Sequence, residues 1–577
     1  MPPYKPSIRQ TSWFQRLARL LPIAGWLSCY RREWLLHDLV AGLTLAAYAV
    51  PVAMAYSSLA GLAPQVGLYC YIFGGIAYAL FGTSRHLAVG PTAAISLMVA
   101  GVVGTMAQGN PASYAAIASL TAAIVALICF LAWLMRLSTF VSFISQSILL
   151  GFKAGAALSI AVTQVPKLLG IPGGGDNFFE RVLIVFQQLA NATPIVAAIG
   201  VAALLILLIA ERFSPGQPAA LVVVILSTIG IYMFDPSGTG VAVVGLIPAG
   251  LPDFGLPHID PGQVEGVMEL AFACFLLSYV ESIAAARTFA EKYHYNVDPR
   301  QELLGLSAAN LFSALLQGYP VAGGLSQSAV NEKAGARTPL SLMFTSLALA
   351  LVLFFLTGLL RYLPQAVLAA IVLTAVVSFI SMSSFRELRR ISRIEFNVAL
   401  VAFIAVLLLG ILKGVAVSAI ASILFLLRML ARPHVATLGR IPGSIRFSDA
   451  VRHTNNETFP GLYLFRVEAP LLYFNVDSIA NTVLENIAKE PHPVRLAVCD
   501  LSTSPYIDAA GARLLDRLEE DLTQQGIQFR VVEAHAEVRE ILRATGISER
   551  LGGVSRHTAL ADIVEEFERE ARQAASQ

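Results

Sequence analysis

The chain has 577 residues, of which 56% are apolar and only 14% are charged, and its mean hydropathy is +0.67. These values exclude a soluble multidomain protein and predict an integral membrane protein. The net charge of +2 is small, and the basic residues lie in loops beside apolar segments rather than on one basic face with interleaved aromatic residues. Nucleic acid is therefore not an expected partner.

Several common chemistries find no support in the sequence. The five cysteines are scattered, without CxxC spacing or nearby histidines, which argues against a disulfide framework or a zinc site. No GxxxxGK[ST], HExxH or GxSxG pattern occurs, so we expect neither an enzyme nor a bound cofactor or metal. Six lysines and arginines among the first 37 residues interrupt any apolar run that could be a cleavable signal. The first span is therefore expected to be retained.

Apolar segments of spanning length recur from residue 38 to residue 431. Because about 17 to 25 residues cross a bilayer, we expect about fourteen spans: 38–58, 65–82, 90–107, 114–136, 139–168, 182–210, 218–234, 264–290, 299–317, 323–334, 338–360, 364–382, 394–411 and 412–431. With the N-terminus inside, the inner loops hold most lysines and arginines, among them Arg386, Arg389, Arg390 and Arg393. The outer loops keep only Lys167, Arg181, Arg361 and Lys413. Both termini are then cytoplasmic.

Two spans are interrupted by small and polar residues at matching positions in the two halves. One is HLAVGPTAAISLM from His86, and the other is VAGGLSQSAV from Val321, within the glycine-rich stretch Gly318 to Pro339. Matched breaks of this kind predict a seven-plus-seven inverted repeat, in which half-helices point their N-termini into one cavity. Helix N-termini attract anions. The alternative is that both breaks are short loops at the membrane surface.

After Arg432 the composition becomes that of a soluble domain. Leu462 to Phe474 predicts a strand, a turn and a second strand, and Val494 to Ser502 predicts a buried strand. The segment AAGARLLDRLEEDLTQQG predicts a helix that ends at Gly526, and IQFRVVEA predicts a returning strand. Strands that alternate with helices indicate a small α/β module.

Five stretches of this chain resemble the SulP family of anion transporters, known in animals as solute carrier family 26. They are PVAMAYSSLAGLAPQVGLY from Pro51, FGTSRHLAVGPTAAISLM from Phe81, YVESIAAARTFA from Tyr279, DPRQELLGLSAANL from Asp298, and the glycine-rich stretch itself. The soluble end resembles the STAS domain of these transporters, through CDLSTSPYIDAAGARLL from Cys499. The resemblance covers essentially the whole chain.

The resemblance implies a homodimer in which a mobile core domain carries the substrate and a gate domain stays comparatively still. It further implies a set of substrate-binding residues: Tyr56 in the first span, Thr92 and Ala93 at the third, and Leu325, Ser326 and Gln327 at the tenth. Glu281 in the eighth span matches the acidic residue of the family's core domain. In related bacterial STAS regulators a phosphorylatable serine follows the loop aspartate, whereas here Asp508 precedes Ala509. Phosphorylation at that position is therefore excluded, and the module is expected to form dimers or bind a cytoplasmic partner.

One position departs from the family pattern. Many members have Ser-Arg-Ser where this chain has Ser326-Gln327-Ser328, so the usual cation beside the anion is missing. A neutral donor replaces a charge-assisted hydrogen bond by one of roughly half its strength. A buried carboxylate without a nearby cation is pushed towards its neutral form, so Glu281 could bring in a proton with the anion. The alternative is a structural Glu281 that accepts hydrogen bonds from Ser278 or Ser282.

Lys153, in the fifth span, is the candidate replacement for the missing arginine. It lies roughly 21 Å along the helix from the predicted inner end of that span, at 1.5 Å per residue. An ammonium group at that depth should face a cavity or an acidic partner. We hypothesise that Lys153, on the gate side, supplies the positive charge. The alternative is that it pairs structurally with a carboxylate or extends to the membrane surface.

These observations favour a secondary active transporter of an inorganic oxyanion, with sulfate:proton symport and elevator-like movement of the core. Sodium-coupled bicarbonate transport, dicarboxylate transport, an anion channel and STAS-mediated signalling stay open as alternatives. We expect residues 1–37 to be a cytoplasmic segment, 38–431 the transmembrane transport domain, 432–457 a linker, and 458–577 the STAS-like domain and tail. Compact loops and a short C-terminal tail favour a bacterial inner membrane, with lipid as a further partner.

Overall fold

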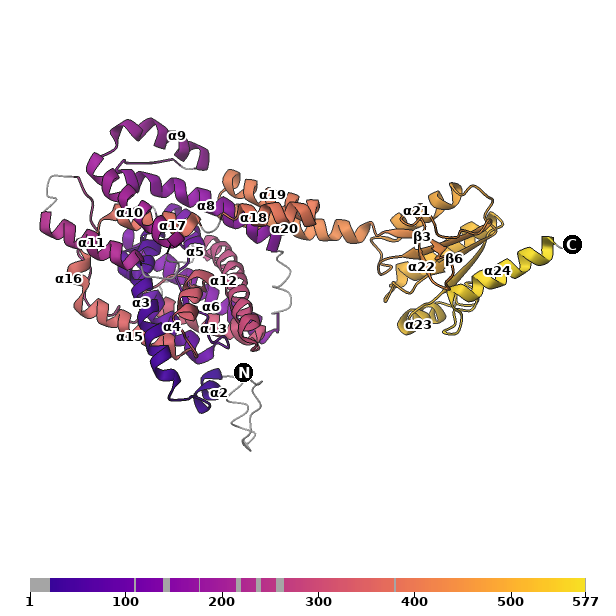
Figure 1. Ribbon diagram of the computed structural model, residues 1–577, viewed down its shortest axis with the longest axis horizontal. Coiled ribbons are helices and arrows are strands. Elements are labelled where there is room, and N and C mark those ends of the chain that lie inside the picture. Colours follow the sequence, from indigo (N-terminus) through magenta and orange to yellow (C-terminus); the bar gives the residue numbers. More distant parts are fainter. Residues whose placement is uncertain are drawn as a thin grey trace. The chain divides into compact units, whose positions relative to one another are not determined.

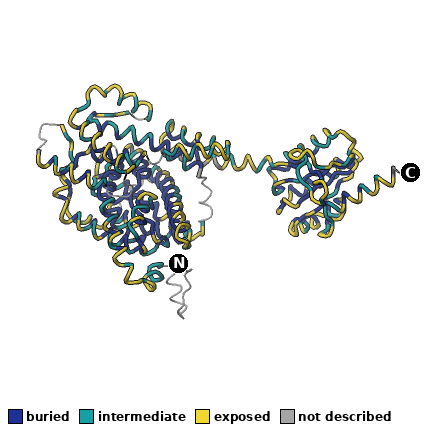
Figure 2. The backbone as a smooth tube through the Cα atoms, viewed as in Figure 1, coloured by how far each residue is buried: buried dark blue, intermediate teal, exposed yellow. Residues whose placement is uncertain are grey.

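The structure is a computed structural model, and it divides into two compact units. It describes residues 21–107, 110–137, 146–175, 177–213, 219–234, 240–255, 264–377 and 380–575. The first unit, which we call the helical unit, covers Met1–Ser422, and the second, the C-terminal unit, covers Ile423–Gln577. Figure 2 shows that buried residues are concentrated in the middle of each unit. Each unit therefore has its own core.

The helical unit consists almost entirely of helices (Figure 1). They are α2 (Pro22–Ser28), α3 (Trp34–Leu59), α4 (Pro64–Phe81), α5 (Ala93–Met106), α6 (Pro111–Leu134), α8 (Gln146–Leu169), α9 (Phe178–Gln188), η1 (Leu189–Asn191), α10 (Pro194–Phe213), α11 (Ala219–Phe234), α12 (Val264–Tyr293), α13 (Pro299–Leu315), α14 (Leu325–Lys333), α15 (Leu340–Phe355), α16 (Thr357–Leu360), α17 (Gln365–Val377), α18 (Met382–Ile391), α19 (Arg393–Leu409) and α20 (Ile411–Ala431). Among the described residues, seven helices are long and apolar enough to cross a membrane, and three shorter apolar helices accompany them.

Each predicted span overlaps one of these helices, but two predictions of continuous spans are wrong. The segment 182–210 contains α9, the turn η1 and then α10, because Pro194 cannot continue the preceding helix and instead begins a new one. The segment 338–360 is divided at Leu356 between α15 and α16. In the fifth predicted span, residues 139–145 lie outside the described residues.

The helices of the helical unit pack as two bundles. In the first bundle α13 packs against α4 and α6, α15 packs against α3 and α4, and α12 packs against α5 and α6. In the second bundle α8 packs against α19, α17 and α10. Helix α3 also contacts α11 and α17, and α5 contacts α8, so these helices join the two bundles.

Glycines allow the closest contacts within each bundle. A Cβ atom on Gly67 of α4 would lie 2.0 Å from the carbonyl oxygen of Ala53 in α3. A Cβ atom on Gly151 of α8 would lie 1.9 Å from the carbonyl oxygen of Ala399 in α19. Larger residues at either position would force the helix backbones apart, because interiors are close-packed.

The C-terminal unit is a mixed α/β module. Its elements beyond α20 are β3 (Val435–Arg440), β4 (Phe447–Asp449), β5 (Leu462–Val467), α21 (Val476–Ala488), β6 (Leu496–Asp500), α22 (Ala509–Gln524), β7 (Gln528–Val532), α23 (Ala536–Ala544) and α24 (Leu560–Ala575). The sheet order is β4-β3-β5-β6-β7, with parallel pairing between β5 and β6 and between β6 and β7. Helices α21, α22 and α23 supply the apolar core on one face of the sheet, and α24 supplies the core on the other.

Two expectations for this end of the chain are corrected. The stretch 432–457, predicted to be a linker, contributes β3 and β4 to the sheet, and β3 pairs with β5 in antiparallel fashion. The strand predicted at the end of Leu462 to Phe474 does not form. Only an isolated bridge joins Leu471 to Ile507 there, because Pro470 lacks the amide hydrogen that a strand ladder requires.

Candidate functional site

The two interrupted segments meet in a short antiparallel ladder. Strand β1 (Val89–Gly90) pairs with β2 (Ala322–Gly323), with Val89 opposite Gly323 and Gly90 opposite Ala322. Helix α5 begins shortly after β1, and α14 begins shortly after β2. Because the strands are antiparallel, the two helices leave the ladder in opposite directions with their N-termini beside it. The breaks seen in the sequence are therefore one structure, although more than 200 residues separate them.

Buried hydrogen bonds hold the ladder in place. The Ser282 hydroxyl accepts from the Gly323 amide at 2.7 Å, and the Ser328 hydroxyl accepts from the Ala88 amide at 2.9 Å. The Asn310 side chain bonds to both the amide and the carbonyl of Val321, at 2.9 and 3.1 Å. Non-helical backbone is thus satisfied within the protein, as a membrane requires.

The N-termini of α5 and α14 have no side-chain cap. Neither Thr92, the N-cap residue of α5, nor Gly324, the N-cap residue of α14, provides a side-chain cap. The Thr92 hydroxyl is buried and has no hydrogen-bond partner in the described part of the chain. Leu325 and Ser326 are exposed in the first turn of α14, whereas Ala93 is buried in α5. Uncapped helix N-termini carry partial positive charge and free donors, which suits an anion.

Glu281 and Lys153 come together from the two bundles. The Lys153 ammonium in α8 lies 3.9 Å from the Glu281 carboxylate in α12. The Glu281 side chain is 9% exposed and the Lys153 side chain 30%, so the lysine keeps access to solvent. Lys153 lies seven residues after Gln146, the start of α8, or roughly 10 Å along the helix axis. The predicted depth of 21 Å was counted from residue 139, the start of the predicted span, and residues 139–145 lie outside the described ranges.

Further residues gather around Glu281. Tyr56 of α3 and Thr92 both lie within electrostatic reach of its carboxylate, although the Thr92 hydroxyl does not reach it with ordinary hydrogen-bond geometry. The Ser282 hydroxyl donates to the Ser278 carbonyl and accepts from β2, and the Ser278 hydroxyl is buried without a partner among the described residues. Neither serine therefore supports Glu281, and Lys153 is its ion-pair partner.

Gln327 is turned into the protein. Its side-chain oxygen accepts a hydrogen bond from the Tyr71 hydroxyl of α4, and its side-chain nitrogen donates to the Ala322 carbonyl of β2 at 3.3 Å. Gln327 is 4% exposed. The amide that was expected to donate to the anion is thus occupied in this structure, and it ties the start of α14 to the ladder.

Sequence reasoning missed Tyr71 and the role of Ser282. Tyr71 lies in an ordinary apolar helix, and its partner Gln327 is 256 residues away, so no local pattern connects the two. The Tyr71 ring also lies against β1, where a Cβ atom on Gly90 would come within 2.6 Å of it. Gly90 is the signal in the sequence that could have indicated this close approach, because a glycine beside a break leaves room for a neighbouring side chain.

The pair Arg85-His86 precedes β1, in the loop after α4. The Arg85 guanidinium lies over the Tyr295 ring at 5.2 Å, and the His86 ring stacks on Tyr293 at 4.7 Å. Burial lowers the pKa of His86 to about 4, so the ring is neutral near pH 7. His86 is therefore a packed aromatic residue and contributes no positive charge near pH 7.

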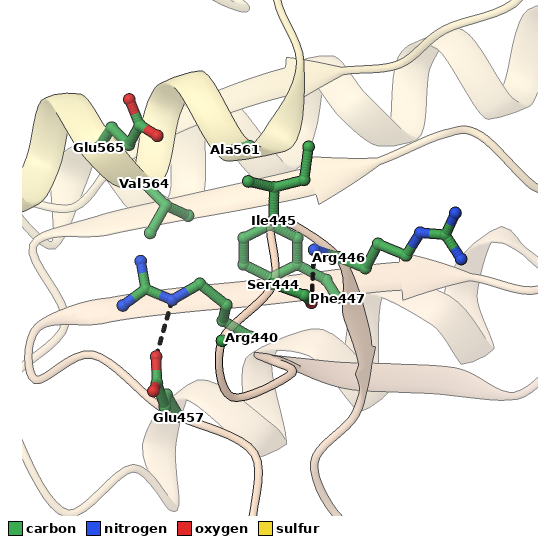
Figure 3. A pocket seen from close by; sticks show the side chains of 10 residues that line it. Arg440, Ser444, Ile445, Arg446, Phe447, Glu457, Ala561, Val564 and Glu565 are labelled. Carbon is green, nitrogen blue, oxygen red and sulfur yellow. Dashed lines mark hydrogen bonds and ion pairs between the residues drawn. The ribbon is translucent and has the colours of Figure 1, made fainter.

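The C-terminal unit contains a capped helix N-terminus and a pocket. The Asp508 carboxylate caps α22 by accepting from the amides of Ala510 and Gly511 at 2.9 and 2.8 Å, so that helix terminus already holds an anionic group. A pocket of about 590 Å³ lies between the β3–β4 hairpin and α24. Figure 3 shows that Arg440 in this pocket is paired with Glu457, while Arg446 extends away from the pair.

Comparison with known proteins identifies the family. The model of the sulfate permease family matches residues 35–402, and the STAS domain model matches residues 453–561. This chain belongs to the SulP family of anion transporters. A relative named as a probable sulfate transporter of Mycobacterium tuberculosis is 33% identical over 542 residues, which cover 94% of this chain and 96% of the relative. The chloroplastic sulfate transporter 4.1 of Arabidopsis thaliana is 30% identical over 568 residues, covering 94% and 82%.

Solved structures show that the SulP fold extends over the whole chain. The murine solute carrier 26 family member A9, an anion transporter in the inward-facing state, matches with a TM-score of 0.87 at 21% identity, covering 97% of this chain and 96% of its own. The transmembrane domain of a cyanobacterial bicarbonate transporter matches with a TM-score of 0.59 at 23% identity, covering 68% and 98%. At these identities the likeness shows the fold alone.

Membership of the SulP family establishes the general nature of the protein. It is a multi-pass membrane transporter with a C-terminal STAS domain, and it is not an enzyme. Among the described residues, no group of three or more His, Cys, Asp or Glu side chains could hold a metal ion. The residues around the β1–β2 ladder are the candidate site of this SulP chain.

Proposed function

We propose that this chain carries sulfate across the membrane together with a proton. The observation that carries the proposal is the Lys153–Glu281 pair, at 3.9 Å, beside two uncapped helix N-termini. Sulfate is an oxyanion with acceptors on all sides, and donors at α5 and α14 would meet it from two directions. The names of the relatives from Mycobacterium and Arabidopsis support sulfate as the substrate.

Lys153 supplies the positive charge that Gln327 lacks in this proposal. The Gln327 side chain is engaged by Tyr71 and Ala322, so it positions α14 rather than contacting the anion directly. The Lys153 ammonium is partly exposed and belongs to the other bundle. An anion at the N-termini would therefore attract Lys153 away from Glu281, because opposite charges attract strongly at low dielectric constant. The ring of Tyr56 would form an apolar wall of the anion site, and its hydroxyl group would be a polar tip.

Glu281 couples the proton to the anion in this scheme. A carboxylate next to a bound dianion is a repulsive arrangement of like charges, and protonation of Glu281 removes that repulsion. When Lys153 turns to the anion, the buried Glu281 loses its counter-charge, which favours the neutral acid further. Anion binding and proton uptake therefore favour each other at one site.

The architecture suggests how the site could face either side of the membrane. When α2, α9, η1, α16 and α18 are left out, each half of the described chain supplies seven helices to the proposed seven-plus-seven repeat, and α5 and α14 each stand third in their half. Glu281 and both half-helices belong to the first bundle, the proposed core, while Lys153 lies in the second, the proposed gate. An elevator-like movement of core against gate would break and remake the Lys153–Glu281 contact. We further propose a homodimer in a bacterial inner membrane, with both termini in the cytoplasm.

Uptake into proteoliposomes tests this function. Radiolabelled sulfate is offered under an imposed pH gradient or an imposed sodium gradient, with bicarbonate and succinate as competitors. We expect the inward proton gradient to drive uptake and the sodium gradient to have no effect. If sodium stimulates sulfate uptake and bicarbonate competes better than succinate, the result would instead favour a sodium-coupled bicarbonate transporter. Strong competition by succinate would favour a dicarboxylate transporter.

The same preparation separates the other classes. Sulfate uptake that is indifferent to both gradients and never concentrates the anion would favour a channel. A membrane protein that signals through its STAS domain would show no uptake of any of the three anions. Either result contradicts the proposed function.

A further inference from the structure

Helix α18 is a short amphipathic helix between two apolar helices of the second bundle. It follows α17, and one residue, Ser392, separates it from α19. It packs against α19 and α8. Ser381 caps its N-terminus by accepting from the Ser384 amide at 3.3 Å. Ser392 ends it and caps α19 by accepting from the Glu395 amide at 3.2 Å. The helix is thus a separate element with defined ends.

The polar face of α18 is strongly basic. Arg386, Arg389 and Arg390 are spaced as i, i+3 and i+4 and therefore share one face, and Arg393 follows as the first residue of α19. All four are exposed. Within the ranges that the structure describes, none of the four forms an ion pair with a carboxylate. The single acidic residue of α18 is Glu387.

Apolar side chains also remain exposed on this small helix. Phe385 packs edge to face against Phe396 of α19, with ring centroids 6.5 Å apart, and so fixes α18 to the bundle. Met382 and Ile391, at its two ends, are 63% and 72% exposed. Arg389 also lies over the Phe396 ring, at 5.9 Å. A helix that presents arginines without a carboxylate partner among the described residues, together with uncovered apolar ends, is suited to the boundary between lipid headgroups and acyl chains.

We propose that α18 binds the phosphate groups of anionic phospholipids through Arg386, Arg389 and Arg390. Guanidinium groups match phosphate oxygens in paired hydrogen bonds, and a cluster of basic residues beside a membrane span attracts anionic headgroups. The exposed Met382 and Ile391 favour a lipid over a free inorganic anion, because a free anion would leave them in water. Basic residues beside span ends favour the cytoplasmic side of the membrane, so these arginines agree with α18 facing the cytoplasm.

Lipid retention by the purified full-length chain tests the site. The protein is transferred from detergent that contains equal amounts of phosphatidylglycerol and phosphatidylcholine, and native mass spectrometry counts the lipids that remain bound. We expect the wild type to retain phosphatidylglycerol preferentially. The triple variant Arg386→Gln, Arg389→Gln and Arg390→Gln should bind this lipid more weakly by on the order of a hundredfold, at roughly fivefold for each arginine.

A matched variant controls for net charge. Arg513, Arg543 and Arg569 are exposed on α22, α23 and α24 of the C-terminal unit, and replacing all three by glutamine removes the same charge elsewhere. This control should keep the wild-type lipid preference. Replacing the three α18 arginines by lysine should restore part of the preference, because the charge returns without the paired hydrogen-bond geometry.

Several outcomes would overturn the proposal. Equal retention of both lipids by the wild type would do so, and this result needs no variant to fold. An unchanged preference in the α18 variant would mean that the retained lipid binds elsewhere on the chain. Displacement of phosphatidylglycerol by glycerol phosphate at equal concentration would mean that the site takes a free anion. The number of retained lipids does not depend on transport. If the chain does not transport sulfate with a proton, the expected preference for phosphatidylglycerol is still the same.

Discussion

Removing the charges of Lys153 and Glu281, singly and together, should reveal the strength of their coupling. At 3.9 Å, two unit charges attract by about 4 kcal/mol when the effective dielectric constant is about 20. The Lys153 side chain is 30% exposed, so solvent screening lowers this value. We expect a net coupling energy of about 1.5 kcal/mol, which corresponds to roughly a tenfold effect on an equilibrium constant.

The experiment is a double-mutant cycle on the purified full-length chain. Lys153→Met, Glu281→Gln and the double variant are compared with the wild type by thermal unfolding in detergent, with sulfate absent. Each single change leaves one charge without its partner, which is costly for the buried Glu281 carboxylate and less so for the partly exposed Lys153 ammonium, whereas the double change removes both charges. The double variant should therefore be more stable than the sum of the two single effects predicts.

Sulfate transport tests the role of Lys153 independently of stability. Lys153→Gln should raise the half-saturating sulfate concentration roughly tenfold, since a charge-assisted contact is lost. Lys153→Arg keeps the charge and should restore most of the affinity. A coupling energy below about 0.3 kcal/mol would mean that the two residues act independently. An unchanged sulfate affinity in Lys153→Gln would refute the idea that this lysine replaces the missing arginine.

Three further substitutions test contacts within each unit. Their effect on stability is measured by thermal unfolding of the full-length chain. Gly67→Ala should destabilise the helical unit by about 3 kcal/mol, because the new Cβ would lie 2.0 Å from a carbonyl oxygen of α3; Gly101→Ala, with nothing within 4 Å, is its control and should be neutral or stabilising. Asp38→Ala should cost about 3 kcal/mol, since the buried carboxylate accepts from the amides of Arg337 and Thr338 at 2.7 and 3.0 Å, and unchanged unfolding would contradict that role. Asp508→Ala removes the cap of α22 and should lower the stability of the C-terminal unit by about 1 kcal/mol, whereas Asp508→Asn should keep most of it.

Apolar segments of spanning length predicted most of the helices of the helical unit, because length and hydrophobicity are local properties of the sequence. The break at Pro194 was missed, since the apolar character continues from α9 into α10 although the helix does not. Strands β3 and β4 were missed for a similar reason. They are short, and their place in the sheet depends on pairing, of β4 with β3 and of β3 with β5.

The candidate site was predictable in part. The hydropathy breaks indicated that two half-helices would meet, and the position of Lys153 within a predicted span indicated that it faces a cavity or an acidic partner. The identity of that partner required packing between two bundles, which no local pattern encodes. The contact between Tyr71 and Gln327 could not be predicted either, and it changes the expected role of Gln327 from an anion donor to a support for the ladder.

The most direct test of the proposed symport measures proton and sulfate fluxes in the same proteoliposomes. A pH electrode in weakly buffered medium records protons that leave the outside solution when sulfate is added, while radiolabelled sulfate uptake is counted. We expect protons to enter with sulfate in the wild type, and Glu281→Gln to abolish the proton flux. Sulfate uptake without proton flux in the wild type, or an unchanged proton flux in Glu281→Gln, would contradict the account.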